Sequence, residues 1–377
     1  MGLPRSHYVQ EGEEGVYHCY CRCVRRAFLF GFDALTRRDF SHRKAWVVDR
    51  LRHLASIFAI EVCAYAVMIT HYHNVLRTRP DLAALWSDRE VATRWLTLFP
   101  PHRDVEGVPL PPSEKEIRAL TDLPDRIAKL RKRLCSLSWF MGRLNEFIAR
   151  AANKEDGVKG RFWESRFKCQ ALLDEAAIAA CMAYVDLNPI RAGAAETLEN
   201  SDFTSIQERI RAWGNEMASM DSLPGQETVQ SMPLRSIDTC APLSEHFRQV
   251  PEANPDGFPV LTRLREAWLC PIQSEPGRRG ILAMTTAEYI DLVDRSGRMM
   301  RPGKRGAIDP GLEPILLRIG ANPDAWLDTV SRFGPKFRLA AGLVSSLRSF
   351  AERLGRCWFQ GVATARIAFG PARPQSA

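Results

Sequence analysis

The sequence predicts an α+β fold built on an antiparallel sheet, followed by a mainly helical C-terminal region. Residues 16–23 alternate in polarity and residues 62–76 are rich in β-branched and aromatic side chains, which indicates strands. Between them, residues 42–58 place apolar side chains at helical spacing. The order strand, helix, strand, strand begins a ferredoxin-like arrangement, for which we expect helices on one face of the sheet.

Composition restricts the class of protein and its compartment. The chain has 377 residues, which is enough for two domains, and 45% of them are hydrophobic, as in an ordinary globular protein. A net charge of +8 makes an anionic partner plausible. The N-terminus has no apolar core of a signal peptide, and no apolar run reaches the length of a membrane span. We therefore expect a cytoplasmic protein that binds no membrane.

Three of the ten cysteines lie in the first predicted strand. Cys19, Cys21 and Cys23 share one face of that strand, because residues two apart point the same way. Three thiols could bind zinc in a structural module, but a closed site needs a fourth ligand. Buried free cysteine also behaves as a small hydrophobe, and we expect these three to pack in the core.

The stretch 62–76 contains a histidine pair. It forms either one long strand or two strands that meet near Thr70. In both cases His71 and His73 project side by side, whereas Tyr72 points to the opposite face. Two neutral imidazoles at this spacing can share one divalent cation. The alternative is two unrelated histidines near the end of a strand.

A tyrosine is carried by a predicted helix over residues 174–188. Asp174 is a good N-cap residue, an alanine-rich run follows, and the helix should end before Pro189. Tyr184 and Asn188 lie four apart and therefore share one face. A helix that carries a tyrosine, packed on a sheet that carries the histidine pair, would combine a nucleophile with a metal site. The alternative is a core tyrosine with a satisfied hydroxyl.

Basic residues recur between the histidine pair and the tyrosine. Residues 78–123 are an insertion with one helix from Ser87 to Leu98, and residues 124–153 form one long helix. Residues 161–170 alternate and predict a further strand. Phosphate contacts and a solvated charged face are two open interpretations for the basic side chains of the long helix, which are Arg126, Lys129, Lys132 and Arg133. Arg161, Arg166 and Lys168 are further candidates for phosphate contacts.

The second half of the chain contains no motif that assigns it a role. Residues 216–242 are polar and aperiodic, so we expect a linker there. Residues 243–377 are mainly helical, and Thr285 with Glu288 forms a capping box.

The histidine and tyrosine motifs together resemble a known family. HYH at residues 71–73, followed by Y-x-x-x-N-P-x-R-A-G at residues 184–193, is similar to the single-tyrosine HUH transposases. Within that family the chain is most similar to the REP-associated tyrosine transposases. Residues 15–18 and 160–167 also fit, and the resemblance covers the chain to about residue 210.

Two positions depart from the family pattern. Family members often have Asn before the first histidine and an apolar residue after the second, whereas this chain has Thr70 and Asn74. Both positions are expected on the strand face of Tyr72, away from the metal.

The resemblance implies a fold, a reaction and a site. Residues 1–215 would form an HUH nuclease domain that cleaves and rejoins single-stranded DNA with hairpins, as a monomer or homodimer. Tyr184 would be the nucleophile of a 5′-phosphotyrosine intermediate, and His71, His73 and Asn188 would hold Mg²⁺ or Mn²⁺. Arg22 and Arg191 join the basic residues named above as DNA contacts. The alternative function is a non-catalytic DNA-binding protein on the same fold.

Overall fold

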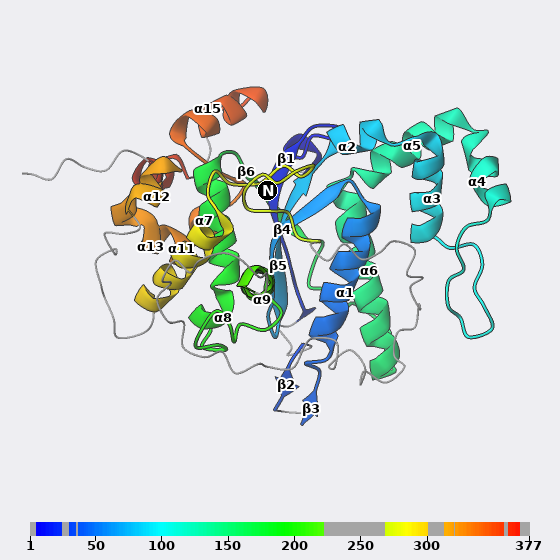
Figure 1. Cartoon of the computed structure of the whole chain (residues 1–377), viewed down its shortest axis with the longest axis horizontal. Coiled ribbons are helices and arrows are strands. Elements are labelled where there is room, and N and C mark those ends of the chain that lie inside the picture. The colour runs from blue at the N-terminus through cyan, green and yellow to red at the C-terminus, as the bar shows by residue number, and fades with distance from the viewer. Residues whose placement is uncertain are drawn as a thin grey trace, which may run out of the picture.

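A five-stranded sheet runs through the middle of the computed structural model (Figure 1). The structure describes residues 5–24, 30–34, 37–221, 268–300, 313–319, 321–357 and 361–369. The strand order is β4-β5-β1-β6-β7, in which all neighbours are antiparallel except β6 and β7. Their bounds are β1 Gly15–Arg22, β4 Ile60–Val67, β5 His71–Thr78, β6 Lys168–Leu172 and β7 Ala340–Ala341.

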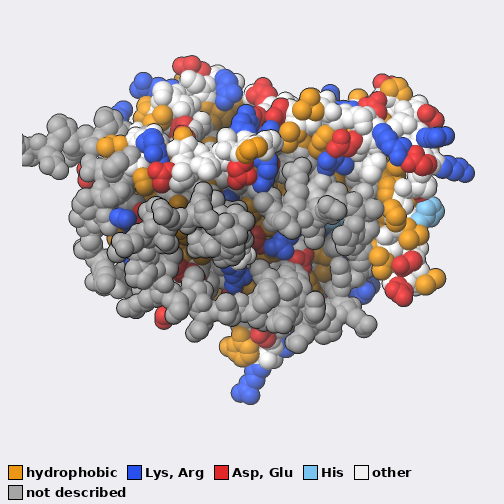
Figure 2. Space-filling view, viewed as in Figure 1, with side chains coloured by type: hydrophobic (Ala, Val, Ile, Leu, Met, Phe, Trp, Pro, Cys, Tyr) orange, Lys and Arg blue, Asp and Glu red, His pale blue; other side chains and the backbone are white. Residues whose placement is uncertain are grey.

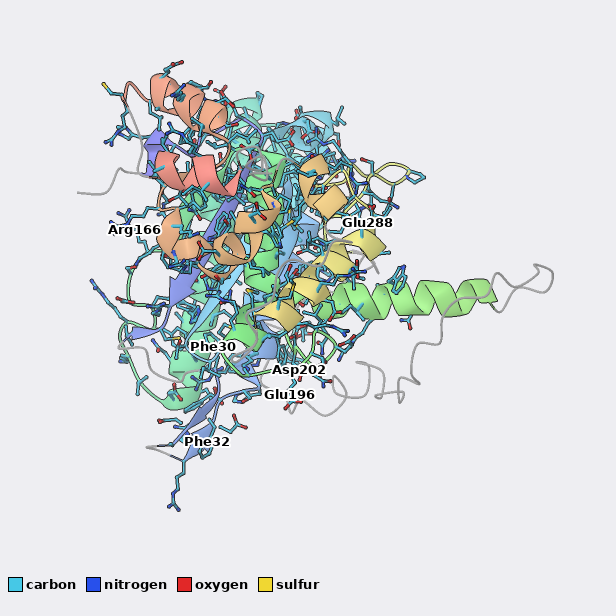
Figure 3. All side chains as sticks on the ribbon, turned by 90° about the vertical axis from the view of Figure 1, so that its left-hand side faces the viewer. Phe30, Phe32, Arg166, Glu196, Asp202 and Glu288 are labelled. Carbon is cyan, nitrogen blue, oxygen red and sulfur yellow. The ribbon has the colours of Figure 1, made fainter. Side chains whose placement is uncertain are left out.

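The stretch that carries the histidines is two strands, which was one of the two expected forms. β4 and β5 pair with each other and are joined by a turn at residues 68–70. A separate two-stranded sheet of β2 (Phe32–Asp33) and β3 (Arg38–Asp39) projects beyond the central sheet, with Phe32 at its exposed end (Figure 3).

Helices cover both faces of the central sheet. Tyr72 on β5 donates a hydrogen bond from Oη to Asn145 Oδ1 (2.6 Å), and Asn145 lies on α6 (Leu137–Asp156). α1 (Arg43–Ile57) packs beside α6 on this face. His73, the next residue of β5, faces α7 (Glu175–Asp186) on the opposite side. The expectation of helices on one face alone was therefore wrong.

The cysteines of β1 fill the core between the sheet and α6. Cys19, Cys21 and Cys23 are buried, and Asn145 Nδ2 lies 3.2 Å from Cys21 Sγ. Among the residues that the structure describes, no group of three or more His, Cys, Asp or Glu side chains is arranged to hold a metal. The burial of all three side chains agrees with the expected packing in the core.

The insertion forms three helices, which are α2 (Pro80–Leu85), α3 (Asp88–Leu98) and α4 (Glu114–Thr121). α3 begins as predicted, because Ser87 Oγ accepts a hydrogen bond from the Glu90 amide (3.1 Å). The long helix expected over residues 124–153 is instead α5 (Pro124–Leu134) followed by α6. Ser136 has an extended backbone between them (ψ 119°), so the helical hydrogen bonding stops there.

The strand expected over residues 161–170 is shorter than predicted. Only Lys168–Leu172 is a strand, whereas residues 161–167 touch β1 through an isolated bridge between Trp163 and Cys23. Phe162 and Phe167 are buried, so packing of aromatic rings fixes this segment where a longer ladder was expected.

The C-terminal region packs on the same core. α9 (Ser205–Asp221) enters the range expected to be a linker, and residues 222–242 lie outside the described residues. The remainder is mainly helical, as expected. α13 lies against α7 (Figure 1), and α14 also contacts α7. The remaining helices are η1 Arg5–His7, α8 Asn188–Arg191, α11 Thr286–Met299, α12 Glu313–Arg318, α13 Pro323–Ser331, α14 Phe333–Lys336, α15 Val344–Arg353 and α16 Val362–Ala368. Across the described ranges, none of the helices has both the length and the apolar composition that crossing a membrane requires.

Candidate active site

The fold brings Tyr184 to the histidine pair. His71 and His73 begin β5, and their ring centroids lie 4.9 Å apart. Tyr184 lies in the last turn of α7, and its ring is edge-on to His73 at 5.6 Å. α7 is rich in alanine and is buried from Ala176 to Asp186, so its backbone can approach the sheet closely. Asp174 caps its first turn by accepting from the Ala177 amide (3.1 Å), as predicted.

Both histidines of the pair have a hydrogen-bond partner at Nδ1. His73 Nδ1 lies 2.9 Å from His18 Nε2, and His71 Nδ1 lies 2.9 Å from Thr70 Oγ1. Because these contacts involve Nδ1, Nε2 is the nitrogen of each ring left as a candidate metal ligand. A histidine that ligates a metal through one nitrogen usually bonds a protein group through the other. The pair therefore fits a cation bound by two nitrogens, with oxygen ligands still required.

Thr70 is not where the sequence placed it. It was expected to point away from the site with Tyr72, but it lies in the turn before β5, where strand alternation does not apply. Its hydroxyl contacts the His71 ring instead. Asn74 does lie on the face of Tyr72, where it is fully buried.

Burial keeps the histidines neutral near pH 7. Loss of solvent lowers the pKa of His18 to about 4. It also lowers the pKa of His71 to about 4, and the positive charge of Arg22 adds to this effect. The pKa of His73 is lowered well below its usual value, again mainly by burial. Neutral imidazoles have a lone pair to offer a cation.

Tyr184 lies among one cation, Arg191, and three aromatic rings, which are those of His18, His73 and Phe333. Burial raises the pKa of its hydroxyl, whereas the charge and hydrogen bond of Arg191 lower it. The Arg191 guanidinium carbon lies 4.9 Å from the centre of the tyrosine ring. From the C-terminal region, the Phe333 ring lies 6.1 Å from that of Tyr184, and a Cβ on Gly334 would lie 3.1 Å from Tyr184 Oη. Only 9% of Tyr184 is exposed.

Asn188 occupies a different element from the one expected. α7 ends at Asp186, and Asn188 begins α8. Its Nδ2 donates to the carbonyl of Tyr184 (3.1 Å), so the side chain caps the C-terminal end of α7. Its Oδ1 makes no hydrogen bond within the described residues, so its role as a metal ligand stays a prediction.

Sequence reasoning missed three residues at the site. The Tyr20 ring lies 5.5 Å from both His18 and His73, and strand alternation with His18 was the available signal. Gln170 pairs with His18 in the sheet, which no local pattern reveals. Phe333 arrives from the C-terminal region, also without a signal in the sequence.

Three of the predicted DNA contacts lie at the site. Arg22 pairs with His71 across β1 and β5. Lys168 pairs with Tyr20 across β1 and β6, and its Nζ lies 5.7 Å from the centre of the Tyr20 ring. Together with Arg191 they form a small group of cations beside the histidine pair and Tyr184.

The other predicted DNA contacts lie on α5 and in the segment that precedes β6. α5 carries Arg126, Lys129, Lys132 and Arg133 on its exposed side, and it packs with α2–α4 on the side of the sheet away from α7 (Figure 1). Figure 2 shows basic side chains mixed with acidic ones at this end of the molecule. Arg161 and Arg166 are exposed, and Arg166 lies at the periphery (Figure 3). The fold therefore does not bring the basic residues of α5 to the histidine pair, whereas Arg166 belongs to the segment that runs beside Arg22, where the Glu164 amide donates to the Arg22 carbonyl (2.9 Å).

Comparison with known proteins gave one similar structure. No family model matches the chain, and no curated protein matches it. A solved structure described as a REP-associated tyrosine transposase bound to a REP hairpin aligns with 63% of this chain and 99% of its own, at 14% identity and a TM-score of 0.28. A TM-score this low does not show a common fold.

Proposed function

We propose that this chain is a metal-dependent single-strand DNA transposase or endonuclease of the HUH type, on a ferredoxin-like sheet. The observation that carries the proposal is the placement of Tyr184 against His73, although 110 positions separate them in the sequence. A hydroxyl nucleophile beside two neutral imidazoles whose nitrogens can bind a cation is suited to metal-dependent phosphoryl transfer.

Tyr184 is the proposed nucleophile. Its Oη attacks phosphorus and forms a 5′-phosphotyrosine, while the bond from phosphorus to the 3′ oxygen breaks. The tyrosine proton is lost and the 3′ oxygen leaves as a hydroxyl. The phosphotyrosine keeps the energy of the phosphodiester bond, so the strand can be rejoined without a nucleotide cofactor. Arg191 favours this step, because its charge stabilises the phenolate that burial disfavours.

His71 and His73 would hold Mg²⁺ or Mn²⁺ through Nε2, with Asn188 Oδ1 as a proposed oxygen ligand. The cation would supply Lewis-acid polarisation of the scissile phosphate. Hard cations prefer oxygen, so phosphate and water would complete the ligand set. Arg22 and Lys168 lie on the same sheet face and would orient the DNA backbone.

A second candidate is a DNA-binding protein that does not cut. The burial of Tyr184 beneath Phe333 favours it, because a covered hydroxyl has to be reached by a phosphate before it can react. Binding would need the cations and the fold but not the tyrosine hydroxyl.

The test is a denaturing gel of the protein with hairpin DNA labelled at its 3′ end, which stays on the fragment joined to the tyrosine, and with Mn²⁺. The wild type should give a slower covalent band, and Tyr184→Phe should give none. Tyr20→Phe is the matched control, since it removes the same atom from a ring 5.5 Å from His73. The control should retain the band.

Two results would contradict this assignment. An adduct in Tyr184→Phe that disappears in Tyr20→Phe would make Tyr20 the nucleophile. A native gel shift with no covalent band in any of the proteins would favour the second candidate.

A further inference from the structure

A chain of side-chain hydrogen bonds crosses three strands and ends at His73, one member of the histidine pair. Gln170 on β6 donates from Nε2 to the carbonyl of Phe337, and its Oε1 lies 3.4 Å from His18 Nδ1 on β1. His18 Nε2 in turn lies 2.9 Å from His73 Nδ1 on β5. These three side chains are at least 96% buried, so water does not compete for the bonds. We call this set the Gln170–His18–His73 relay.

The backbone carbonyl of Phe337 fixes the donor and the acceptor of every hydrogen bond in the relay. A backbone carbonyl can only accept, so the Gln170 amide must turn its NH₂ toward Phe337 and its oxygen toward His18. That oxygen also accepts, so His18 carries its proton on Nδ1. A neutral imidazole has one N–H and one lone pair, which leaves the His18 lone pair on Nε2.

The same logic applies to the next ring. His18 Nε2 accepts, so His73 must donate from Nδ1, and the lone pair of His73 is left on Nε2. His71 is held differently, because its partner is the Thr70 hydroxyl, which can donate as well as accept. One histidine of the pair is therefore fixed in a single tautomer and the other is not.

We infer that Gln170, anchored by the Phe337 carbonyl, sets through His18 the tautomer of His73 that offers Nε2 to a cation. Gln170 and His18 are then positioning residues, although neither would touch the cation. The tautomer of His73 can be observed in the protein without metal. The statement that this tautomer serves cation binding rests on the proposed function. The relay also gives the C-terminal region a part in the site, because Phe337 supplies the carbonyl from which the order of bonds starts.

The experiment reads the tautomers directly. Long-range ¹H–¹⁵N correlation spectra of the full-length, metal-free protein, with ¹⁵N-labelled histidine, distinguish a proton on Nδ1 from one on Nε2. In the wild type, both His18 and His73 should carry it on Nδ1. Gln170→Leu removes the acceptor for His18, so both rings should become mixtures. His18→Phe keeps a ring of similar size and should make His73 a mixture.

Thr70→Val is the matched control, because it removes the partner of His71 and leaves the relay intact. It should alter the signals of His71 alone. A second readout is Mn²⁺ affinity without DNA, followed by electron paramagnetic resonance. Loss of a group that orients a metal ligand lowers affinity roughly 10- to 100-fold, and we expect a decrease of that size in Gln170→Leu.

Three results would overturn the inference. They are a wild-type His73 protonated on Nε2, unchanged His18 and His73 tautomers in Gln170→Leu, and unchanged Mn²⁺ affinity in that variant. The wild-type spectrum decides the point even if a variant fails to fold. If the tautomers are as expected but the wild type gives no covalent adduct with DNA, the proposed function fails while the relay stands.

Discussion

The two faces of β1 and β5 use the same strands for opposite purposes. On the α6 side, these strands carry Cys19, Cys21, Tyr72 and Asn74, which are all buried, and Asn145 of α6 bonds Tyr72 and Cys21. Toward α7, the alternate positions carry His18, Tyr20 and His73. Adjacent residues of one strand therefore belong to the packed core on one face and to the candidate active site on the other. Variants at adjacent positions should separate stability from activity.

The largest difference is expected between His73 and its neighbour Tyr72. His73→Gln removes a proposed cation ligand and should lower adduct formation at least about 100-fold, since loss of a group that acts in phosphoryl transfer has effects of this order. Tyr72→Phe removes the 2.6 Å bond to Asn145 and should cost about 1–3 kcal/mol of unfolding free energy, with cleavage retained. Gel assays and urea unfolding of both variants measure the two effects. Equal loss of activity in both would contradict the division between faces.

The next effect is a dependence of stability on pH that arises on the α7 face. The pKa of His18 is about 4 in the folded protein, below the 6.5 of an exposed histidine. Between these values the unfolded chain binds a proton that the folded chain does not, so stability falls as pH decreases from 6.5 to 4. The loss from this group is about 3 kcal/mol at most.

The contribution of His18 is measured as a difference between proteins. The pKa of Asp186 is raised to about 6, mainly by burial, which gives the opposite slope between pH 3.8 and 6. Urea unfolding of wild type and His18→Gln at pH 7 and pH 4.5 cancels that contribution. The variant should lose less stability on acidification, and equal losses would show that His18 does not titrate as inferred.

The smallest effect is expected from Asn74, on the α6 face. Both polar atoms of its fully buried amide lack a hydrogen-bond partner within the described residues. Asn74→Leu should raise the unfolding free energy by about 1–2 kcal/mol, because an unsatisfied buried amide is replaced by an apolar group of similar size. Thermal unfolding tests this, with adduct formation as the check that the other face is unchanged. A destabilised variant would indicate a partner that Asn74 needs.

Local patterns predicted the elements but not their meeting points. Alternation identified β1, helical spacing identified α1, and Ser87 and Thr285 marked the starts of α3 and α11. Each of these signals depends only on residues that are close to one another in the sequence.

The features that the sequence did not predict depend on packing between distant segments. The apolar residues between 127 and 148 fit one continuous helix as well as two, so the break at Ser136 had no signal. The register that sets Gln170 beside His18 and the fold that brings Phe333 to Tyr184 join segments more than 140 residues apart. The pairing of His71 and His73 with Tyr184 was inferred only because the spacing of the two motifs resembles a known family.

The bond between Gln170 and Phe337 has a practical consequence for anyone shortening this protein. A chain ended at residue 215 would contain His71, His73 and Tyr184, yet it would lose the carbonyl that Gln170 needs. It would also expose the edge of β6 that β7 covers. Asp186 would lose the Tyr289 hydroxyl that bonds its carboxylate at 2.6 Å. If such a truncated protein aggregated or failed to cut DNA, the cause could be the loss of these C-terminal contacts. Its inactivity would therefore not test whether Tyr184 is the nucleophile.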